Sequence, residues 1–426
     1  MNSELSELLT DLRKKSKIDI LHVSDLKFLE EDILYKTNSK ISFNTLRRLY
    51  GFLPKTKTSK KTLDILSKYL GFQSFSAYLN NKNLYDDWYF KMKILRIQEK
   101  RNTPTDKEVT LLQTALENNI NIIMVSDFVG NLIENKKKET LILFFKNLKY
   151  QSILDSNKIK LAIIATYSFY KLSNNNRIEL YKQLIHIDGF KYCIPFGFID
   201  YSHLNGYYFK VLQAIKKLNK NESDILFVDL MLNLKEYFSN KINKTIQIKE
   251  PINKADIHPV LLGRYFGWLI LANQKLKPKL KEEINSYLKK GDPKLLLIEI
   301  VPALILTEEF NYLGVIIDLY YEEIFVRDRW TAEGQGFNFL IGLANVNIFN
   351  NNLKGAKINL KFINTEKIES SYTDYLTLFL NLSWLKIAVL ENDAKNIDFY
   401  YNSISSLANK IGFFKFIEIA NQYKIN

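Results

Sequence analysis

Cysteine, histidine, glycine and proline are all scarce in this chain of 426 residues, and each scarcity excludes a kind of structure or site. The single cysteine, Cys193, cannot form an internal disulfide bond, and the four histidines are scattered singly, so no structural zinc site is expected. Fifteen glycines and eight prolines are too few for the tight turns of a large β protein, which favours helices joined by short polar loops. We therefore expect an all-α fold, no metal ion or other cofactor, and a reducing, cytoplasmic environment.

Long apolar runs and catalytic motifs are missing as well. The longest apolar run, Leu295 to Leu306, is interrupted by Glu299 and Pro302, and the N-terminus has no apolar core of signal-peptide type, so no membrane partner is expected. Acidic pairs such as Glu308 and Glu309 are adjacent on a predicted helix, where neighbouring side chains diverge by about 100°. The GxSxG and P-loop motifs are absent. The sequence therefore predicts a protein that is not an enzyme, although a single sequence leaves open a site assembled from distant helices.

The chain carries a formal net charge of +14, but its local distribution is more informative than its total. Lys, Asn, Ile and Tyr are abundant throughout, and such a bias makes a protein basic without any polyanionic partner. Residues 1–80, however, contain 14 basic and 9 acidic side chains, and the stretch from Lys36 to Lys61 contains eight basic residues and no acidic one. This local excess indicates a surface for a polyanion such as DNA.

A short helix is predicted inside this basic stretch, in the sequence ISFNTLRRLYG from Ile41 to Gly51. Ser42 is a suitable N-terminal cap for a helix that runs to Phe52, and its apolar residues fall on one face. The opposite face carries Asn and Arg, which form bidentate hydrogen bonds with adenine and guanine in the major groove. Ten residues are expected to contact double-stranded DNA. Five belong to the cap and the helix, namely Ser42, Phe43, Asn44, Arg47 and Arg48. Five lysines on either side of the helix are expected to contact phosphates, namely Lys40, Lys55, Lys57, Lys60 and Lys61.

The segments around this helix follow a recognisable order. A helix over residues 25–37, with Leu26, Leu29, Ile33 and Leu34 at helical spacing, is followed by the turn TNSKI, by ISFNTLRRLYG, by a basic loop and by TLDILSKYLGF. This order resembles the helix-turn-helix domains of the Cro/phage-repressor (XRE) class over roughly residues 20–80, although the turn is a residue or two longer than in that class. The resemblance implies a DNA-binding domain, which we place at residues 1–80.

From residue 84 to residue 426 the sequence consists of helical patterns of about 12 to 18 residues separated by Asn, Lys, Gly or Pro. A brief linker is expected at residues 80–83. Antiparallel helix pairs of this kind are typical of an α-solenoid, and the segment resembles tetratricopeptide repeats in architecture, without a clean 34-residue consensus. The domain order is similar to that of peptide-responsive transcription regulators. That resemblance implies a peptide or protein effector bound in the groove of the repeats, and a homodimer.

Two other segments contain candidate binding residues. The polar break RDRWTAEGQG contains Arg327, Arg329 and Trp330, which are suited to bind a peptide carboxylate if the solenoid has a concave site; a capped helix junction is the plainer interpretation. The aromatic-rich block 189–209 either lines a groove or, as is more usual for aromatics at helical spacing, belongs to the core.

We therefore interpret the sequence as a DNA-binding transcription regulator. The alternative is a non-catalytic scaffold for protein–protein interaction, whose N-terminal head docks onto a partner protein.

Overall fold

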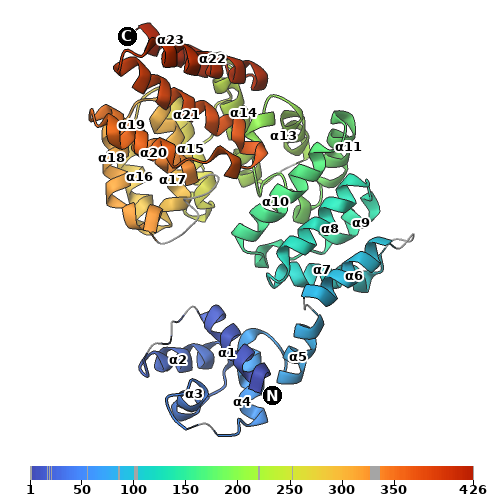
Figure 1. The fold of residues 1–426 in the computed structure, drawn as a ribbon. Coiled ribbons are helices and arrows are strands. Elements are labelled where there is room, and N and C mark those ends of the chain that lie inside the picture. The colour runs from blue at the N-terminus through green and yellow to red at the C-terminus, as the bar shows by residue number, and fades with distance from the viewer. Residues whose placement is uncertain are drawn as a thin grey trace. The chain divides into compact units, whose positions relative to one another are not determined.

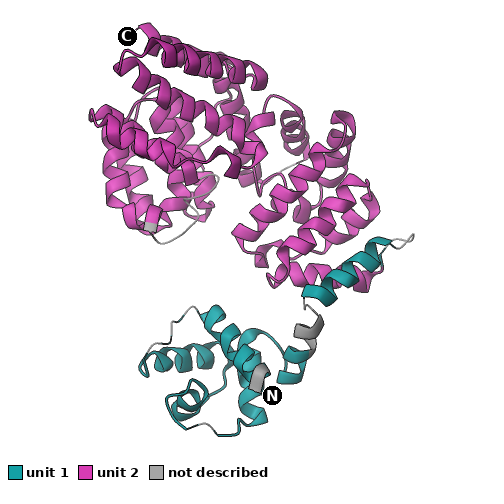
Figure 2. Ribbon diagram, viewed as in Figure 1, with its two compact units in different colours: residues 1–104 teal, residues 105–426 magenta. Residues whose placement is uncertain are grey.

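The fold is all-helical. The computed structural model describes residues 2–16, 18, 20, 22–54, 56–84, 87–99, 104–218, 221–251, 253–326 and 336–425, and no strand occurs among them (Figure 1). The expected all-α class is therefore confirmed. The chain divides into two compact units, residues 1–104 and residues 105–426 (Figure 2).

The described part of the first unit contains six helices, of which the second, third and fourth correspond to the segments expected to form the helix-turn-helix domain. They are α1 (Asn2–Ser16), α2 (Asp25–Thr37), α3 (Phe43–Leu49), α4 (Lys60–Leu70), α5 (Phe75–Leu84) and α6 (Asp87–Glu99). Buried residues of α1, α2, α3, α4 and α5 form one core that includes Leu12, Leu29, Leu46, Leu66 and Tyr78. Each of these helices is short, so burial of an apolar face in this common core stabilises it more than helix propensity does.

Two details of the first unit differ from expectation. Leu34, expected on the buried side of α2, is 43% exposed, because the buried stripe follows Leu26, Leu29 and Ile33. The residues expected as a linker, 80–83, belong to α5. Asn and Lys are only mildly unfavourable in a helix, so a polar segment without Gly or Pro need not end one. A stronger stop signal lies at the end of the unit, where Pro104 precedes the capping box of Thr105.

The second unit contains seventeen α-helices in its described part. They are α7 (Asp106–Glu117), α8 (Ile122–Glu134), α9 (Lys138–Lys146), α10 (Asp155–Tyr170), α11 (Asn174–Leu184), α12 (Asp188–Cys193), α13 (Tyr207–Leu218), α14 (Glu222–Phe238), α15 (Pro259–Asn273), α16 (Pro278–Lys290), α17 (Pro293–Leu306), α18 (Phe310–Leu319), α19 (Phe337–Phe349), α20 (Leu353–Lys361), α21 (Ser370–Leu390), α22 (Ala394–Ile411) and α23 (Lys415–Ile425). Short 3₁₀ turns lie at η1 (Tyr150–Ser152), η2 (Tyr201–His203), η3 (Ile242–Lys244), η4 (Lys254–Asp256) and η8 (Thr365–Lys367), and a π-helical turn, η5 (Glu322–Val326), follows α18.

Alternate helices in the C-terminal half of this unit pack in a row. α15 packs on α17, α17 on α19, and α19 on α21, while α20 packs on α19 and α22 on α21 (Figure 1). The contact between α15 and α17 is so close that a Cβ atom on Gly263 would lie 2.2 Å from the carbonyl oxygen of Leu296. Glycine at this position therefore sets the distance between the two helices.

At several helix ends, asparagine takes the left-handed position that glycine often occupies. Among the described residues, nine non-glycine residues have positive φ, and six of them are Asn, including Asn38 after α2 and Asn392 between α21 and α22. Asn tolerates the left-handed conformation better than most residues, since its short side chain can form local hydrogen bonds. The turn at residues 391–393, between α21 and α22, is of this kind.

Candidate nucleic-acid interface

Helix α3 is held in place by its cap and by one buried leucine. The Oγ atom of Ser42 accepts a hydrogen bond of 3.2 Å from the backbone N–H of Thr45, so this hydroxyl acts as the expected N-terminal cap. Leu46 is fully buried in the core of the first unit. The helix ends at Leu49, three residues earlier than expected, because Gly51 adopts a left-handed conformation with φ of 83°.

The turn between α2 and α3 is fixed by local hydrogen bonds and by one apolar side chain. Asn38 is left-handed, and its N–H bonds to the carbonyl oxygen of Leu34. The hydroxyl of Thr37 donates to the carbonyl oxygen of Ile33 at 2.7 Å, and that of Ser39 donates to the carbonyl oxygen of Thr37 at 3.2 Å. Ile41 is buried in the core. The turn, although long, therefore has one defined path that leads directly into the cap of α3.

The outward side chains of α3 are not equivalent. Asn44 is exposed, and its Oδ1 atom accepts a hydrogen bond of 3.3 Å from Nη1 of Arg47. The guanidinium of Arg47 also lies over the ring of Phe43, 5.9 Å from its centroid, and Phe43 itself packs against the core. The guanidinium of Arg48 has no hydrogen bond or ion pair among the described residues. Asn44 and Arg48 are therefore the side chains available to a partner, whereas Phe43 and Arg47 also support the helix.

A basic residue of α1, which the sequence analysis missed, lies close to α3. The guanidinium of Arg13 lies 5.2 Å from the centroid of the Tyr50 ring, directly after α3. Burial raises the pKa of the Tyr50 hydroxyl to about 12, although the positive charge of Arg13 opposes this shift. Arg13 is 37 residues from Tyr50 in sequence, so only the tertiary fold brings the two together.

Lysines from two segments surround an open depression between the α2–α3 turn and α4. Its lining residues are Ser39, Lys40, Lys60, Lys61, Asp64, Ile65 and Lys68. Three of these lysines were expected to contact DNA, and the structure brings them together, whereas Lys68 was not expected there. Lys57 is exposed in the preceding loop, and Lys55 lies outside the described residues.

A cluster of polar side chains joins α2 and α4. Nζ of Lys36 lies 2.8 Å from the carboxylate of Asp32, which also accepts a hydrogen bond from the hydroxyl of Tyr69. Burial alone would raise the pKa of Asp32, but the hydrogen bonds from Lys36 and Tyr69 outweigh it and lower the pKa. The Lys36 side chain therefore neutralises an acidic residue of its own unit and is less available to a partner than the lysines of the depression.

The candidate residues of the second unit do not form a described site. Arg327, Arg329 and Trp330 lie outside the described residues. The aromatic-rich block belongs largely to the core, because Phe190, Tyr201 and Tyr207 are buried. Cys193 is fully buried, and burial raises the pKa of its thiol to about 12, so the thiolate form is disfavoured.

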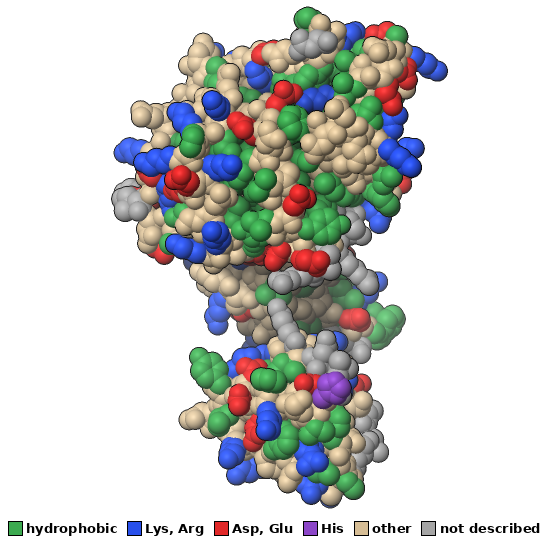
Figure 3. All heavy atoms as spheres, turned by 90° about the vertical axis from the view of Figure 1, so that its left-hand side faces the viewer, with side chains coloured by type: hydrophobic (Ala, Val, Ile, Leu, Met, Phe, Trp, Pro, Cys, Tyr) green, Lys and Arg blue, Asp and Glu red, His purple; other side chains and the backbone are tan. Residues whose placement is uncertain are grey.

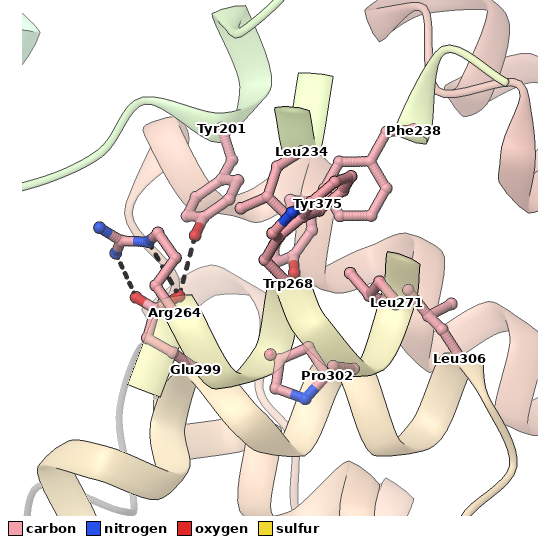
Figure 4. Close-up of a pocket in the computed structure, with 12 residues that line it drawn as sticks. Tyr201, Leu234, Phe238, Arg264, Trp268, Leu271, Glu299, Pro302, Leu306 and Tyr375 are labelled. Atoms are coloured by element: carbon pink, nitrogen blue, oxygen red, sulfur yellow. Dashed lines mark hydrogen bonds and ion pairs between the residues drawn. The ribbon is translucent and has the colours of Figure 1, made fainter. Parts of the chain in front are cut away.

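The second unit also encloses a small cavity of about 20 Å³, lined by side chains of α14, α15, α17, α21 and η2 (Figure 4). A volume of this size accommodates roughly one water molecule. At its edge Nη2 of Arg264 lies 2.5 Å from Oε1 of Glu299, and the hydroxyl of Tyr201 donates to Oε2 of Glu299 at 3.2 Å. The cavity is therefore a packing feature around a buried ion pair rather than a site for a small molecule.

No group of three or more His, Cys, Asp or Glu side chains is placed to hold a metal ion in the part of the chain that the structure describes. Within the same residues, no helix combines the length and the apolar character required to cross a lipid bilayer. Comparison with protein-family models, with curated proteins and with solved structures finds no match to the chain.

Proposed function

We propose that this chain is a cytoplasmic, non-catalytic DNA-binding transcription regulator. In this proposal α2 and α3 form a helix-turn-helix of the Cro/phage-repressor class, and α3 enters the major groove. Asn44 and Arg48 contact base edges, and the surrounding basic residues contact phosphates.

The observation that carries the proposal is the combination of a fixed helix with unpaired polar groups on its outer side. Ser42 and Leu46 hold α3, while Arg48 and Lys57 have no ion pair among the described residues. Lys254 and Lys386 of the second unit, by contrast, form ion pairs with carboxylates. A basic group kept in position without an anionic partner in its own chain is what phosphate binding requires.

For the second unit we propose a helical-repeat domain of tetratricopeptide type that binds a peptide or protein effector and joins two chains. The row formed by α15, α17, α19 and α21, with α20 and α22 packed on it, supports this proposal. A dimer would present two copies of α3 to half-sites about one helical turn, or 34–36 Å, apart. Binding of an effector to the repeats would change that spacing.

The test is selection of duplexes from a random pool by the full chain, followed by anisotropy titrations at fixed salt. Arg48→Ala should relax base preference at one position of the enriched site, with a loss of about 1–3 kcal/mol of discrimination. Lys57→Ala should weaken binding to every sequence equally and lower the salt slope by about one.

Lys27→Ala is a matched control, because Lys27 is also exposed on the first unit and has no ion pair among the described residues. Its DNA affinity should equal that of the unaltered chain. If the Arg48→Ala/Lys57→Ala double variant bound DNA as tightly as the unaltered chain, this surface would not be the DNA interface.

One observation favours the alternative, a scaffold for protein–protein interaction. Val315 and Leu319 on α18, and Ile358 and Phe362 at α20, are large apolar side chains that are 48% to 70% exposed. Apolar side chains gather on the face of the second unit that Figure 3 shows. Larger exposed apolar patches mark interaction sites. Salt-sensitive binding with no enriched sequence in the selection would support the scaffold over the regulator.

A further inference from the structure

The depression beside α3 contains a row of lysines along α4. Lys61 and Lys68 are seven residues apart, so they lie on the same face of α4, separated by about 10 Å along its axis. Lys60 precedes them, and Lys40 closes the depression from the α2–α3 turn. Lys40 is two residues before the cap Ser42, so the depression lies next to the start of α3.

The positive charges of this row are not neutralised within the unit. Lys40, Lys60, Lys61 and Lys68 are all exposed, and none has an ion pair among the described residues. The one acidic residue of the depression, Asp64, forms no ion pair with these lysines among the described residues, and its Oδ1 accepts a hydrogen bond of 2.8 Å from the backbone N–H of Phe75. Its single negative charge leaves the four lysines with a clear positive excess.

The polar and apolar groups between the lysines suggest no small ligand. The hydroxyl of Ser39 donates to the carbonyl oxygen of Thr37, and Ile65, which is 8% exposed, forms an apolar base. The depression therefore offers charge with little directional hydrogen bonding. Groups of this kind suit a partner that carries repeated negative charges and is recognised by its charge rather than by its shape.

We propose that Lys40, Lys60, Lys61 and Lys68 bind the phosphate backbone of one DNA strand beside the base-contacting side chains of α3. This inference rests on the proposed function. It extends that function by adding Lys68 to the phosphate contacts and by placing α4 beside one DNA strand. Consecutive phosphates of one strand rise about 3.4 Å along the duplex axis and also turn around it, so the row meets consecutive phosphates when α4 runs along the strand rather than along the axis. The row contributes affinity and salt dependence but no base preference.

The experiment compares the full-length Lys61→Ala/Lys68→Ala variant with the unaltered chain by anisotropy titration. The probes are two unrelated duplexes, each titrated between 50 and 200 mM salt. Each lost phosphate contact lowers the salt slope by about 0.9, so the unaltered chain should lose about twelvefold more affinity than the variant across this range. The two duplexes should show the same change.

Lys289→Ala/Lys290→Ala is the matched control, since it removes from the end of α16 two exposed lysines that have no ion pair with any described residue. Its slope should be unchanged, and thermal melting of both variants should match that of the unaltered chain, because all four side chains are exposed. An unaltered slope in the Lys61→Ala/Lys68→Ala variant would overturn the inference and leave the proposed function standing. A loss on only one duplex would also overturn it, since it would assign these lysines to base contacts. Failure of the unaltered chain to bind any duplex would overturn both.

Discussion

The buried ion pair between Arg264 and Glu299 gives the sharpest stability prediction in the second unit. Arg264 is 4% exposed, and its guanidinium bonds to both carboxylate oxygens of Glu299, which also accepts from Tyr201 (Figure 4). Burial alone would lower the pKa of Arg264, but the adjacent carboxylate raises it above its ordinary value. The arginine therefore stays charged in the folded protein, and the stability of the fold depends on Glu299 to neutralise this buried charge.

Replacing one partner should cost far more than replacing both. Glu299→Leu leaves a charged guanidinium buried without a counter-ion, which typically costs about 3–5 kcal/mol. The free energy of unfolding of an ordinary protein is about 5–15 kcal/mol, so this cost is a large part of it. The double variant Arg264→Met/Glu299→Leu removes both charges and keeps similar volume, and substitutions of this type are often neutral or stabilising. We expect the double variant to be more stable than Glu299→Leu alone by at least about 2 kcal/mol.

Urea unfolding followed by tryptophan fluorescence measures this difference, because Trp268 lines the same cavity as the ion pair. Arg264→Met completes the double-mutant cycle, and the interaction free energy is read from the four midpoints. A cost below about 1 kcal/mol for Glu299→Leu would show that water reaches the pair and that its burial is not decisive. Additive costs in the double variant would refute the claim that the two charges depend on each other.

Two further predictions concern the distance between helices and the response to acid. Gly263→Ala places a Cβ atom against the carbonyl oxygen of Leu296 and should destabilise the second unit by about 1–3 kcal/mol in urea unfolding. Gly291→Ala, whose Cβ would meet only an ordinary contact at 3.5 Å, should be nearly neutral. Burial alone would raise the pKa of Asp32, but hydrogen bonds lower this pKa overall. The carboxylate therefore stabilises the folded state above about pH 4, and this contribution is lost as the pH falls further. Asp32→Asn should therefore lower the melting temperature at neutral pH and flatten its decline in acid, and an unchanged acid profile would contradict this assignment.

The helices of the candidate interface could be predicted because each depends on residues close in sequence. Ser42 and Ser59 cap α3 and α4, and Gly71 ends α4 in a left-handed conformation, as its position after an apolar-periodic segment indicates. The turn between α21 and α22 rests on the same kind of local signal, with Asn392 left-handed and Asp393 as the cap.

The parts that could not be predicted depend on tertiary contacts or on weak local preferences. No pattern in the sequence places Arg13 over Tyr50, because the two residues are joined only by packing of α1 near α3. Arg47 and Arg48 are identical in the sequence pattern, yet only Arg47 lies over Phe43 and donates to Asn44. Residues 80–83 continue α5 because Asn and Lys oppose a helix too weakly to end it.

The net charge of the chain is a weaker argument for a polyanionic partner than the way its charges are paired. In the second unit Lys191 contacts both Asp188 and Asp224, and Arg264 contacts Glu299, so these basic groups stabilise packing within the chain. In the first unit Arg48 and Lys68 are held by ordered helices but have no counter-ion among the described residues. Neighbouring like charges repel one another, and an anion placed between them removes that repulsion in addition to forming its own contacts. Electrostatic affinity should therefore be highest where unpaired basic groups lie close together, as around α3 and α4, and neutralising paired lysines of the second unit should alter stability rather than the salt dependence of DNA binding.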